Sequence, residues 1–276
     1  MPELPEVEHV VRALQTVVAG RVIVKAELHR QRLAPDITPR SFAKKLAGAT
    51  IKFIHRRGKH ILFDLDNRRT LIVHLRMSGK FLLLTSDDAD PKFAHAVFYF
   101  SDETRLVFQD QRHFGLMKLV DTSKLYEAKE LSKLAPEPFS DEFSPGYLIT
   151  RLKASNRALK EFLLDQTKVC GLGNIYASEA LFLAKISPSK RTQAVSKARA
   201  EALFISIRDV LDEAIRSGGS IEVDPRNIGE GVYGEGSETA WRVYDRENEA
   251  CPDCGSAIRR IKQAGRSTYY CGKCQR

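Results

Sequence analysis

Hydrophobic residues near the N-terminus recur at the spacing of an α-helix. From Pro5 to about Val18 the apolar side chains fall three or four positions apart, and Gly20 follows the last of them: Val7, Val10, Val11, Leu14, Val17 and Val18. Apolar residues at this period form the buried face of an amphipathic helix, and a glycine just past the last turn is a common helix end. The pattern predicts one helix directly after the N-terminus.

Between Arg21 and Val120 the pattern changes to short runs rich in β-branched and aromatic residues. Eight such runs are separated by turn residues: Val22–Leu28, Thr50–Arg57, His60–Asp66, Thr70–Arg76, Lys80–Thr85, Phe93–Phe100, Thr104–Asp110 and Leu116–Val120. Tight turns such as Asp66-Asn67-Arg68 join neighbouring runs, which favours antiparallel pairing. We predict antiparallel sheets packed as a sandwich, with a short helix near Ser41–Leu46.

Helical spacing returns after Ala135-Pro136-Glu137-Pro138, a proline-punctuated segment typical of a domain boundary. Four helices are predicted beyond it, the last closed by Gly218-Gly219: Pro145–Leu152, Arg157–Asp165, Asn174–Ala184 and Ser196–Arg216. Before the third of them, Gly171 and Gly173 allow a tight turn, and Asn174 is a good helix cap. The N–H groups of this turn are suited to holding a phosphate, although glycine turns also join helices for packing alone.

These changes of pattern predict an α+β, multidomain fold. We expect an N-terminal antiparallel β-sandwich with flanking helices over 1–135, a helical domain over 136–226, a flexible loop and connector over 227–246, and a C-terminal zinc-finger β-hairpin over 247–276. With 276 residues the chain is long enough for more than one core. The loop is rich in glycine, and both a disordered linker and a lid over a pocket fit its composition.

The balance of basic and acidic residues indicates what kind of partner the protein binds. Lys and Arg number 44 against 35 Asp and Glu, so the formal net charge of +9 favours a polyanion such as nucleic acid. The N-terminus does not have the basic and apolar segments of a secretory signal, and no apolar run approaches the roughly 18 residues of a membrane helix. We therefore expect an intracellular protein with no membrane association.

Four of the five cysteines form two CxxC pairs near the C-terminus, Cys251 with Cys254 and Cys271 with Cys274. This spacing predicts one structural zinc ion held by four thiolates, with no coordination position open to water. A reduced cysteine cluster without metal is the alternative. Between the pairs lie four cations that a β-hairpin would present near its tip: Arg259, Arg260, Lys262 and Arg266.

The Pro2-Glu3 pair at the N-terminus offers a second kind of chemistry. If Met1 is removed, Pro2 becomes a secondary amine, and since α-amino groups titrate near about 7.7–8.0, part of it is unprotonated at neutral pH. Such an amine forms a Schiff base with a masked aldehyde, and Glu3 would transfer protons. A solvated helix start also accounts for these residues, because Pro5 and Glu6 both suit a first helical turn.

Two loop segments of the β-rich half place an apolar residue and an arginine together. His74–Gly79 contains Met77, and Asp110–Gly115 contains Arg112 and Phe114. An exposed apolar side chain can enter a base stack and an arginine can replace lost hydrogen bonds, although core packing explains each segment alone. His55 and His95 are interpreted as strand residues with satisfied rings.

Taken together, these motifs resemble the formamidopyrimidine-DNA glycosylases (Fpg/MutM) of the Fpg/Nei family over essentially the whole chain. The matching segments are PELPEVE at the terminus, RRGK at 56–59, MSG at 77–79, D-x-R-x-F-G at 110–115, LAPEP at 134–138, GLGNIYASE at 171–179, GG at 218–219 and the four-cysteine finger ending in CQR. The resemblance implies a helix-two-turns-helix domain, a monomer, damaged double-stranded DNA as partner and a cytoplasmic, nucleoid-associated, bacterial-type location.

The implied activity is that of a bifunctional DNA glycosylase and AP lyase of base excision repair. It removes oxidised purines such as 8-oxoguanine and formamidopyrimidines through a Schiff base, then cleaves the strand by β- and δ-elimination. By resemblance, the catalytic set consists of the nucleophile Pro2, the acid Glu3, the proton-transfer residue Lys59 and Arg266, a zinc-finger arginine that binds phosphate. The DNA-binding set consists of Met77, Arg112 and Phe114, which fill the gap left by a flipped base, and His95, Lys160 and Asn174 near the lesion and its phosphates.

Five positions depart from the family pattern, which puts lesion preference and DNA affinity in doubt: Arg76, Phe93, Gln111, His113 and Asn156. Leu4 favours the purine branch, since Nei-like enzymes for oxidised pyrimidines usually have glycine there. A non-catalytic zinc DNA-binding protein of the same fold is the other alternative. Such a protein would have no chemical need for Pro2, Glu3 and Lys59 together.

Overall fold

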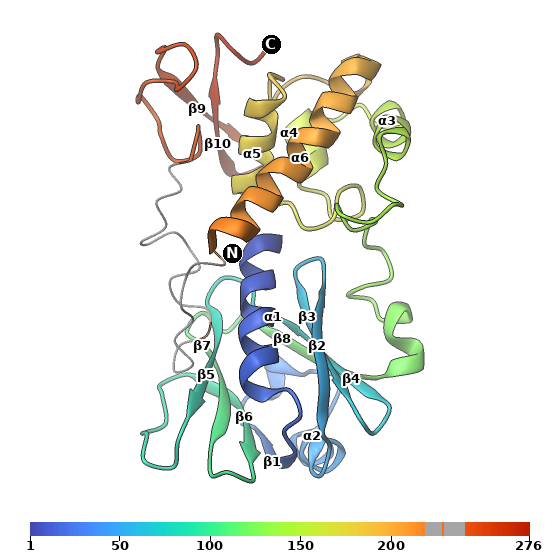
Figure 1. Cartoon of the computed structure of the whole chain (residues 1–276), viewed down its shortest axis with the longest axis vertical. Helices are drawn as coiled ribbons and strands as arrows, with labels where there is room; N and C mark the ends of the chain where they lie inside the picture. The colour runs from blue at the N-terminus through green and yellow to red at the C-terminus, as the bar shows by residue number, and fades with distance from the viewer. Residues whose placement is uncertain (219–227, 229–240) are drawn as a thin grey trace. The chain divides into compact units, whose positions relative to one another are not determined.

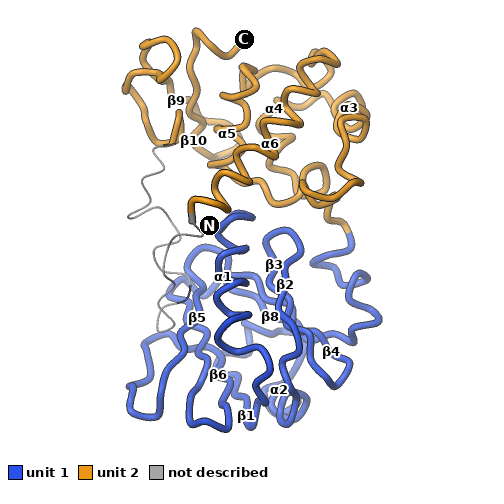
Figure 2. The backbone as a smooth tube through the Cα atoms, viewed as in Figure 1, with its two compact units in different colours: residues 1–132, 218–236 blue, residues 133–217, 237–276 orange. Residues whose placement is uncertain are grey.

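The computed structural model describes residues 1–218, Ile228 and 241–276 (Figure 1). The glycine-rich part of the loop predicted over 227–246 therefore lies outside the described residues. The chain separates into two compact units, one of residues 1–132 with 218–236 and one of residues 133–217 with 237–276 (Figure 2).

The first unit holds the eight predicted strands, with ends shifted by no more than two residues: β1 (Ile23–Leu28), β2 (Ile51–Arg57), β3 (His60–Leu65), β4 (Arg69–His74), β5 (Gly79–Leu84), β6 (Ala94–Phe100), β7 (Arg105–Asp110) and β8 (Leu116–Asp121). They form two antiparallel sheets of order β1-β6-β7-β5 and β2-β3-β4-β8. The antiparallel pairing predicted from the short turns is confirmed.

A single apolar core joins the two sheets. Phe63 of β3 and Phe81 of β5 meet edge to face with ring centroids 5.7 Å apart, and both rings belong to one buried cluster. Helix α1 (Leu4–Val18) adds its predicted apolar face to this cluster and packs against β2, while α2 (Pro39–Leu46) packs against β1. The β-sandwich with flanking helices is thus confirmed, because each sheet buries one face against the other.

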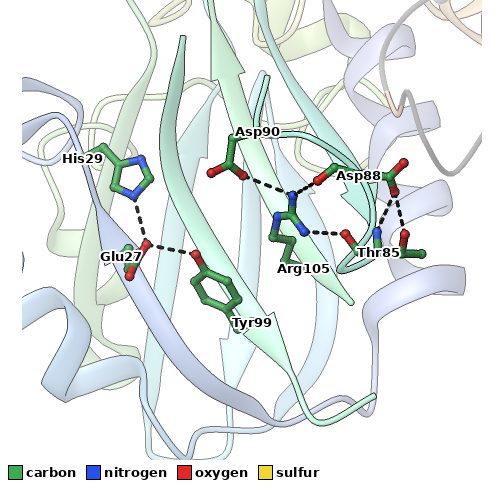
Figure 3. Close-up of polar contacts among 7 residues, drawn as sticks. All are labelled: Glu27, His29, Thr85, Asp88, Asp90, Tyr99 and Arg105. Atoms are coloured by element: carbon green, nitrogen blue, oxygen red, sulfur yellow. Dashed lines mark hydrogen bonds and ion pairs between the residues drawn. The ribbon is translucent and has the colours of Figure 1, made fainter. Parts of the chain in front are cut away.

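The outer face of the β1-β6-β7-β5 sheet carries a polar network (Figure 3). Arg105 of β7 is buried, and its guanidinium donates to the backbone oxygens of Thr85 and Asp88 and pairs with Asp90. A buried guanidinium needs acceptors for its N–H groups, so these three oxygens hold the loop after β5 in place. Beside this group, Glu27 of β1 accepts from the Tyr99 hydroxyl of β6 at 3.0 Å.

Replacing Glu27 with glutamine should lower stability in a pH-dependent way. Hydrogen bonds from Lys25 and then His29 lower the pKa of Glu27 from the ordinary 4.5 to about 2. A depressed carboxyl pKa stabilises the fold above the unfolded value and loses that contribution as pH falls from about 4.5 toward 2. Because the side chain is partly exposed, we expect Glu27→Gln to cost at most about 1 kcal/mol at pH 7.

Urea denaturation at pH 7 and again near the acid end of that window measures this effect. The difference between wild type and Glu27→Gln should shrink at low pH. Glu103→Gln, at an exposed glutamate, is the matched control for removing one surface carboxylate. A Glu27→Gln deficit of equal size at both pH values would contradict the assignment.

The second unit contains the predicted helices and hairpin: α3 (Pro145–Lys153), α4 (Leu159–Leu163), α5 (Asn174–Leu183), α6 (Lys197–Gly218), β9 (Ile258–Gln263) and β10 (Arg266–Cys271). The described residues also include three short 3₁₀ helices that the apolar periodicity does not reveal: η1 (Gln31–Leu33), η2 (Thr122–Glu127) and η3 (Thr192–Ala194). The zinc-finger hairpin packs on α5 through Phe182, Ile258 and Tyr269.

Three local details in this unit differ from the prediction. Helix α4 is shorter than Arg157–Asp165, because Ala158 is extended and forms a bridge with Arg191. Helix α6 continues through Gly218 instead of ending before it. Gly173, with an extended backbone, is the N-cap of α5, and Asn174 is its first helical residue. In the described part of the chain no helix is both long and apolar enough to cross a membrane.

Candidate active site and metal centre

The N-terminal segment combines a helix start with a buried carboxylate. Glu3 is the N-cap of α1 and forms a capping box with Glu6: the Glu3 N–H donates to Glu6 Oε2 at 2.6 Å, and the Glu3 carboxylate accepts from the Glu6 N–H. Pro2 is buried and Glu3 is 2 % exposed. Glu3 is therefore a helix cap, but both residues are buried, so the expectation of a solvated helix start is wrong. The cap fixes the Glu3 carboxylate one residue after Pro2.

Charged groups of the first unit act on the N-terminal amine. Burial lowers the pKa of the Met1 amine, Glu3 and Glu6 act in the opposite direction, and Lys59 and Arg112 lower this pKa further. A lowered pKa leaves more of the amine unprotonated at neutral pH. The structure thus brings Glu3, Lys59 and Arg112 into the electrostatic surroundings of the chain's first residue.

Lys59 lies in the tight turn that joins β2 to β3. Gly58 adopts a left-handed conformation with φ of 59°, which favours glycine in a two-residue hairpin, and Arg57 pairs with His60 across the turn. Lys59 is 5 % exposed. The Arg56 Nε donates to Glu8 Oε2 of α1 at 2.8 Å. This ion pair ties the hairpin that carries Lys59 to the helix that carries Glu3.

Met77, Arg112 and Phe114 lie in two loops with their side chains at the surface. Met77 is 43 % exposed in the β4–β5 turn, and Phe114 is 51 % exposed in the β7–β8 loop. The Arg112 guanidinium lies 5.4 Å from the centre of the Phe114 ring. Core packing, the alternative for these two segments, does not account for their apolar side chains, because both face solvent.

Asp110 links these two loops and was not singled out in the sequence. Its buried carboxylate accepts from the Ser78 hydroxyl in one loop and from the N–H groups of Arg112 and Gly115 in the other, the latter at 2.6 Å. Charge-assisted hydrogen bonds of this kind are strong when buried. The only sequence signal was an acid at the end of a strand that otherwise reads as buried.

Two glycines allow the loops to approach the core. A Cβ on Gly79 would lie 2.5 Å from the Leu75 carbonyl oxygen, and one on Gly115 would lie 2.8 Å from the Phe108 ring. Backbone at these positions is too close to its neighbours for any side chain. This explains the glycines of the MSG and F-G segments.

His95 is a strand residue with a satisfied ring, as the sequence indicates. Its Nε2 lies 2.9 Å from the Asp110 carbonyl oxygen and 2.8 Å from His113 Nδ1. A carbonyl only accepts, so Nε2 carries the hydrogen and His113 Nδ1 is an acceptor. Burial lowers the pKa of His95. Phe93 packs edge-on against His113 at 5.5 Å, so two positions that depart from the family pattern form one contact.

The remaining predicted residues lie in the second unit, and they differ in exposure. Arg266 is exposed at the hairpin turn. Asn174, at the start of α5, donates through Nδ2 to the Ser267 carbonyl oxygen at 2.9 Å. Lys160 is 1 % exposed, and its Nζ donates to Ser178 Oγ at 2.6 Å. Lys160 is therefore an internal residue of this unit.

Glu179 is a second buried acid that sequence reasoning missed. Its carboxylate accepts from the N–H groups of Arg242, Val243 and Tyr244, each at 2.9 Å. Three backbone donors on one carboxylate fix the chain where it enters the zinc finger. The available signal was that Glu179 is the one charged residue of helix α5.

The four C-terminal cysteines form a site suited to zinc. All four Sγ atoms lie within 4.8 Å of one another, with Cys251–Cys274 at 3.9 Å and Cys254–Cys271 at 3.5 Å. Zn–S bonds of about 2.3 Å in a tetrahedron require sulfur separations of about 3.8 Å. The thiols therefore fit one structural zinc ion, and four sulfur ligands leave no position for water.

Family models match three stretches of the chain. Residues 1–117 match the formamidopyrimidine-DNA glycosylase N-terminal domain, residues 134–224 its H2TH domain, and residues 248–276 a zinc finger found in FPG and IleRS. The chain is 42% identical over 290 residues to the formamidopyrimidine-DNA glycosylase of Roseobacter denitrificans, with 100% of both proteins covered. It is 41% identical to that of Bacillus subtilis, covering 100% of this chain and 99% of the relative.

Solved structures give the same result. A complex between Lactococcus lactis Fpg and DNA containing an abasic site has a TM-score of 0.89 at 36% identity, with 99% of both chains covered. A complex of an L. lactis mutant with DNA containing Fapy-dG matches equally well, at 36% identity and a TM-score of 0.89. The chain therefore belongs to the formamidopyrimidine-DNA glycosylase family, the DNA glycosylases of base excision repair.

Proposed function

We propose that this chain, once Met1 is removed, excises oxidised purines from duplex DNA with Pro2 as nucleophile and then cleaves the strand as an AP lyase. The observation that supports this most directly is the surroundings of the N-terminal amine. Burial lowers the pKa of the Met1 amine, one residue before Pro2, and the charges of Glu3, Lys59 and Arg112 act on it. An amine beside an acid and a buried lysine is what Schiff-base chemistry on a sugar requires.

In the proposed reaction the Pro2 nitrogen attacks C1′ of the damaged nucleotide as the bond from C1′ to the base breaks. Glu3 supplies a proton as the sugar ring opens, which leaves an iminium between Pro2 and C1′. Loss of a C2′ proton then expels the 3′ phosphate, and a second elimination expels the 5′ phosphate. Lys59, buried in its turn near the amine, transfers protons and offsets phosphate charge during these steps.

Damaged double-stranded DNA is the proposed partner. Met77 and Phe114 would enter the base stack where the damaged nucleotide has left it, and Arg112 would hydrogen-bond the orphaned base. Asn174 and Arg266 are proposed to contact phosphates, and His95 to support the loops around Asp110. Support comes from the exposed side chains of the two loops and from L. lactis relatives solved with abasic-site DNA.

We further propose that the chain acts as a monomer in the bacterial cytoplasm, on nucleoid DNA. We propose that the functional domains are the β-sandwich over 1–135, the helical domain over 136–226, the loop and connector over 227–246 and the zinc finger over 247–276. This division agrees in outline with the family matches over residues 1–117, 134–224 and 248–276.

Lesion preference is the test of this proposal. Leu4 favours purines, whereas L. lactis Fpg, a relative 36% identical, has also been solved with DNA containing an oxidised pyrimidine. We expect single-turnover excision from an 8-oxoguanine duplex to exceed that from a thymine glycol duplex by at least about tenfold, the scale on which shaped pockets discriminate. A preference for thymine glycol would favour a Nei-like enzyme, and binding without any excision would favour a non-catalytic DNA-binding protein.

A further inference from the structure

Lys160 of α4 begins a chain of hydrogen bonds that crosses three elements of the second unit. Its Nζ donates to Ser178 Oγ at 2.6 Å, and Ser178 Oγ donates to the Asn174 carbonyl oxygen at 2.9 Å. The Asn174 side-chain Nδ2 then donates to the Ser267 carbonyl oxygen at 2.9 Å. The chain therefore runs from α4 through α5 to β10, and it ends one residue from Arg266.

The direction of each hydrogen bond follows from the groups involved. An ammonium only donates and a carbonyl only accepts, so the Ser178 hydroxyl must accept from Lys160 and give its single hydrogen to Asn174. Both Lys160 and Ser178 are 1 % exposed. Hydrogen bonds to a charged group in such surroundings are stronger than neutral ones, so this arrangement restrains the serine and the first turn of α5.

The position of the charge matters as well as its hydrogen bonds. Gly173 caps α5, and the N-terminal turn of this helix carries backbone N–H groups that favour an anion. A buried ammonium joined through Ser178 to the carbonyl of Asn174 adds positive potential behind that turn, where solvent screens it little. The hydrogen bonds and the positive potential both act on Asn174 and on strand β10, which begins at Arg266. Asn174 and Arg266 are the two residues proposed above to contact phosphates.

We propose that Lys160 is a positioning residue that acts through Ser178, and that it makes no direct contact with DNA. Its ammonium holds Asn174 and the backbone beside Arg266 in the arrangement that binds two phosphates, and it strengthens that site from within. This inference rests on the proposed DNA-binding function.

The salt dependence of DNA binding distinguishes a positioning role of Lys160 from direct contact between Lys160 and a phosphate. Each phosphate neutralised by a protein cation releases counterions, so removing a contacting cation reduces the slope of log K against log salt by about 1. A buried lysine that only positions other groups weakens binding, and the slope is unchanged because Arg266 itself still reaches its phosphate, with poorer geometry. Arg266→Ala provides the comparison for a cation that is proposed to contact phosphate.

The experiment compares Lys160→Met, Ser178→Ala and the double variant, using a duplex that contains a tetrahydrofuran abasic-site analogue. We expect each single variant to weaken binding by about 10- to 100-fold, the scale of a lost charge-assisted hydrogen bond. The double variant should be no weaker than Lys160→Met, because both changes break one chain. The salt slope should match wild type for all three variants and fall by about 1 only for Arg266→Ala.

Controls keep this inference separate from the proposed function. Lys197→Met, at an exposed lysine of α6, should leave binding near the wild-type value. If Lys160→Met does not fold, Ser178→Ala alone decides, since it keeps the charge and removes one hydroxyl. A slope reduced by about 1 in Lys160→Met, or unchanged affinity in Ser178→Ala, overturns the positioning role. Wild type that fails to bind the duplex and to form a borohydride-trapped adduct overturns the proposed function instead.

Discussion

Protein that retains Met1 should form no covalent adduct with an abasic-site duplex under borohydride, whereas the processed chain should be trapped efficiently. With Met1 attached, the nitrogen of Pro2 belongs to an amide and has no nucleophilic lone pair. The amine of Met1 is displaced by one residue, about 3.8 Å along the chain. Since misplacement by about 1 Å can cost roughly 10²-fold, we expect trapping to fall by at least that factor.

The measurement needs the two forms side by side. Mass spectrometry identifies which form carries Met1, and binding to the tetrahydrofuran duplex, which cannot form a Schiff base, serves as the control for folding. Processed Pro2→Gly loses the secondary amine and should also lose the adduct. Equal trapping of protein verified to retain Met1 would remove Pro2 from its proposed role.

Loss of the zinc ion should abolish DNA binding and leave the β-sandwich folded. The hairpin core is small, with Ile258 and Tyr269 among its few buried apolar residues. A two-stranded hairpin is marginal by itself, and binding of structural zinc contributes about 10–16 kcal/mol to folding of such units. We expect chelation or Cys254→Ser to weaken binding at least about 10²-fold, because Arg266 at the hairpin turn loses its position.

Zinc content, duplex affinity and circular dichroism of the strands measure this outcome together. The matched control is Cys170→Ser, at the fifth cysteine, which is buried with its thiol 3.8 Å from Glu137 Oε1 and lies outside the cysteine cluster. It should retain one zinc ion per chain and wild-type affinity. Affinity unchanged after zinc is lost from the protein would exclude a role of the finger in DNA binding.

Most of the helices and strands could be predicted from the sequence, because these elements depend on the local spacing of apolar residues. The strands of the sandwich and the six predicted helices end within two residues of their predicted bounds, since periods of 2 and 3.6 are properties of neighbouring positions. The errors lie where non-local contacts decide. Ala158 bridges Arg191 and shortens α4, and the tight turn at Gly173 takes the cap position from Asn174.

The residues of the candidate site also fall into those that the sequence identified and those whose contacts only the structure revealed. The zinc ligands were evident from two CxxC pairs, because the geometry of the metal demands that spacing. The link between the Met77 and Phe114 loops was not evident, because Asp110 meets Ser78 across 32 residues of sequence. Nor does any pattern in the chain indicate that Lys160 is internal, since lysine is rarely buried.

The sequence by itself therefore determined the strands, the helices and the zinc ligands through residue type and spacing. It indicated the family through the resemblance of its motifs, and it marked Pro2-Glu3 as a candidate catalytic pair. Only the tertiary structure decided which of these groups act on one another: Lys59 and Arg112 on the N-terminal amine, and Lys160 on Ser178. The physical reason is that burial and distance set how strongly one charged group acts on another. Both burial and distance arise from contacts between segments far apart in the chain.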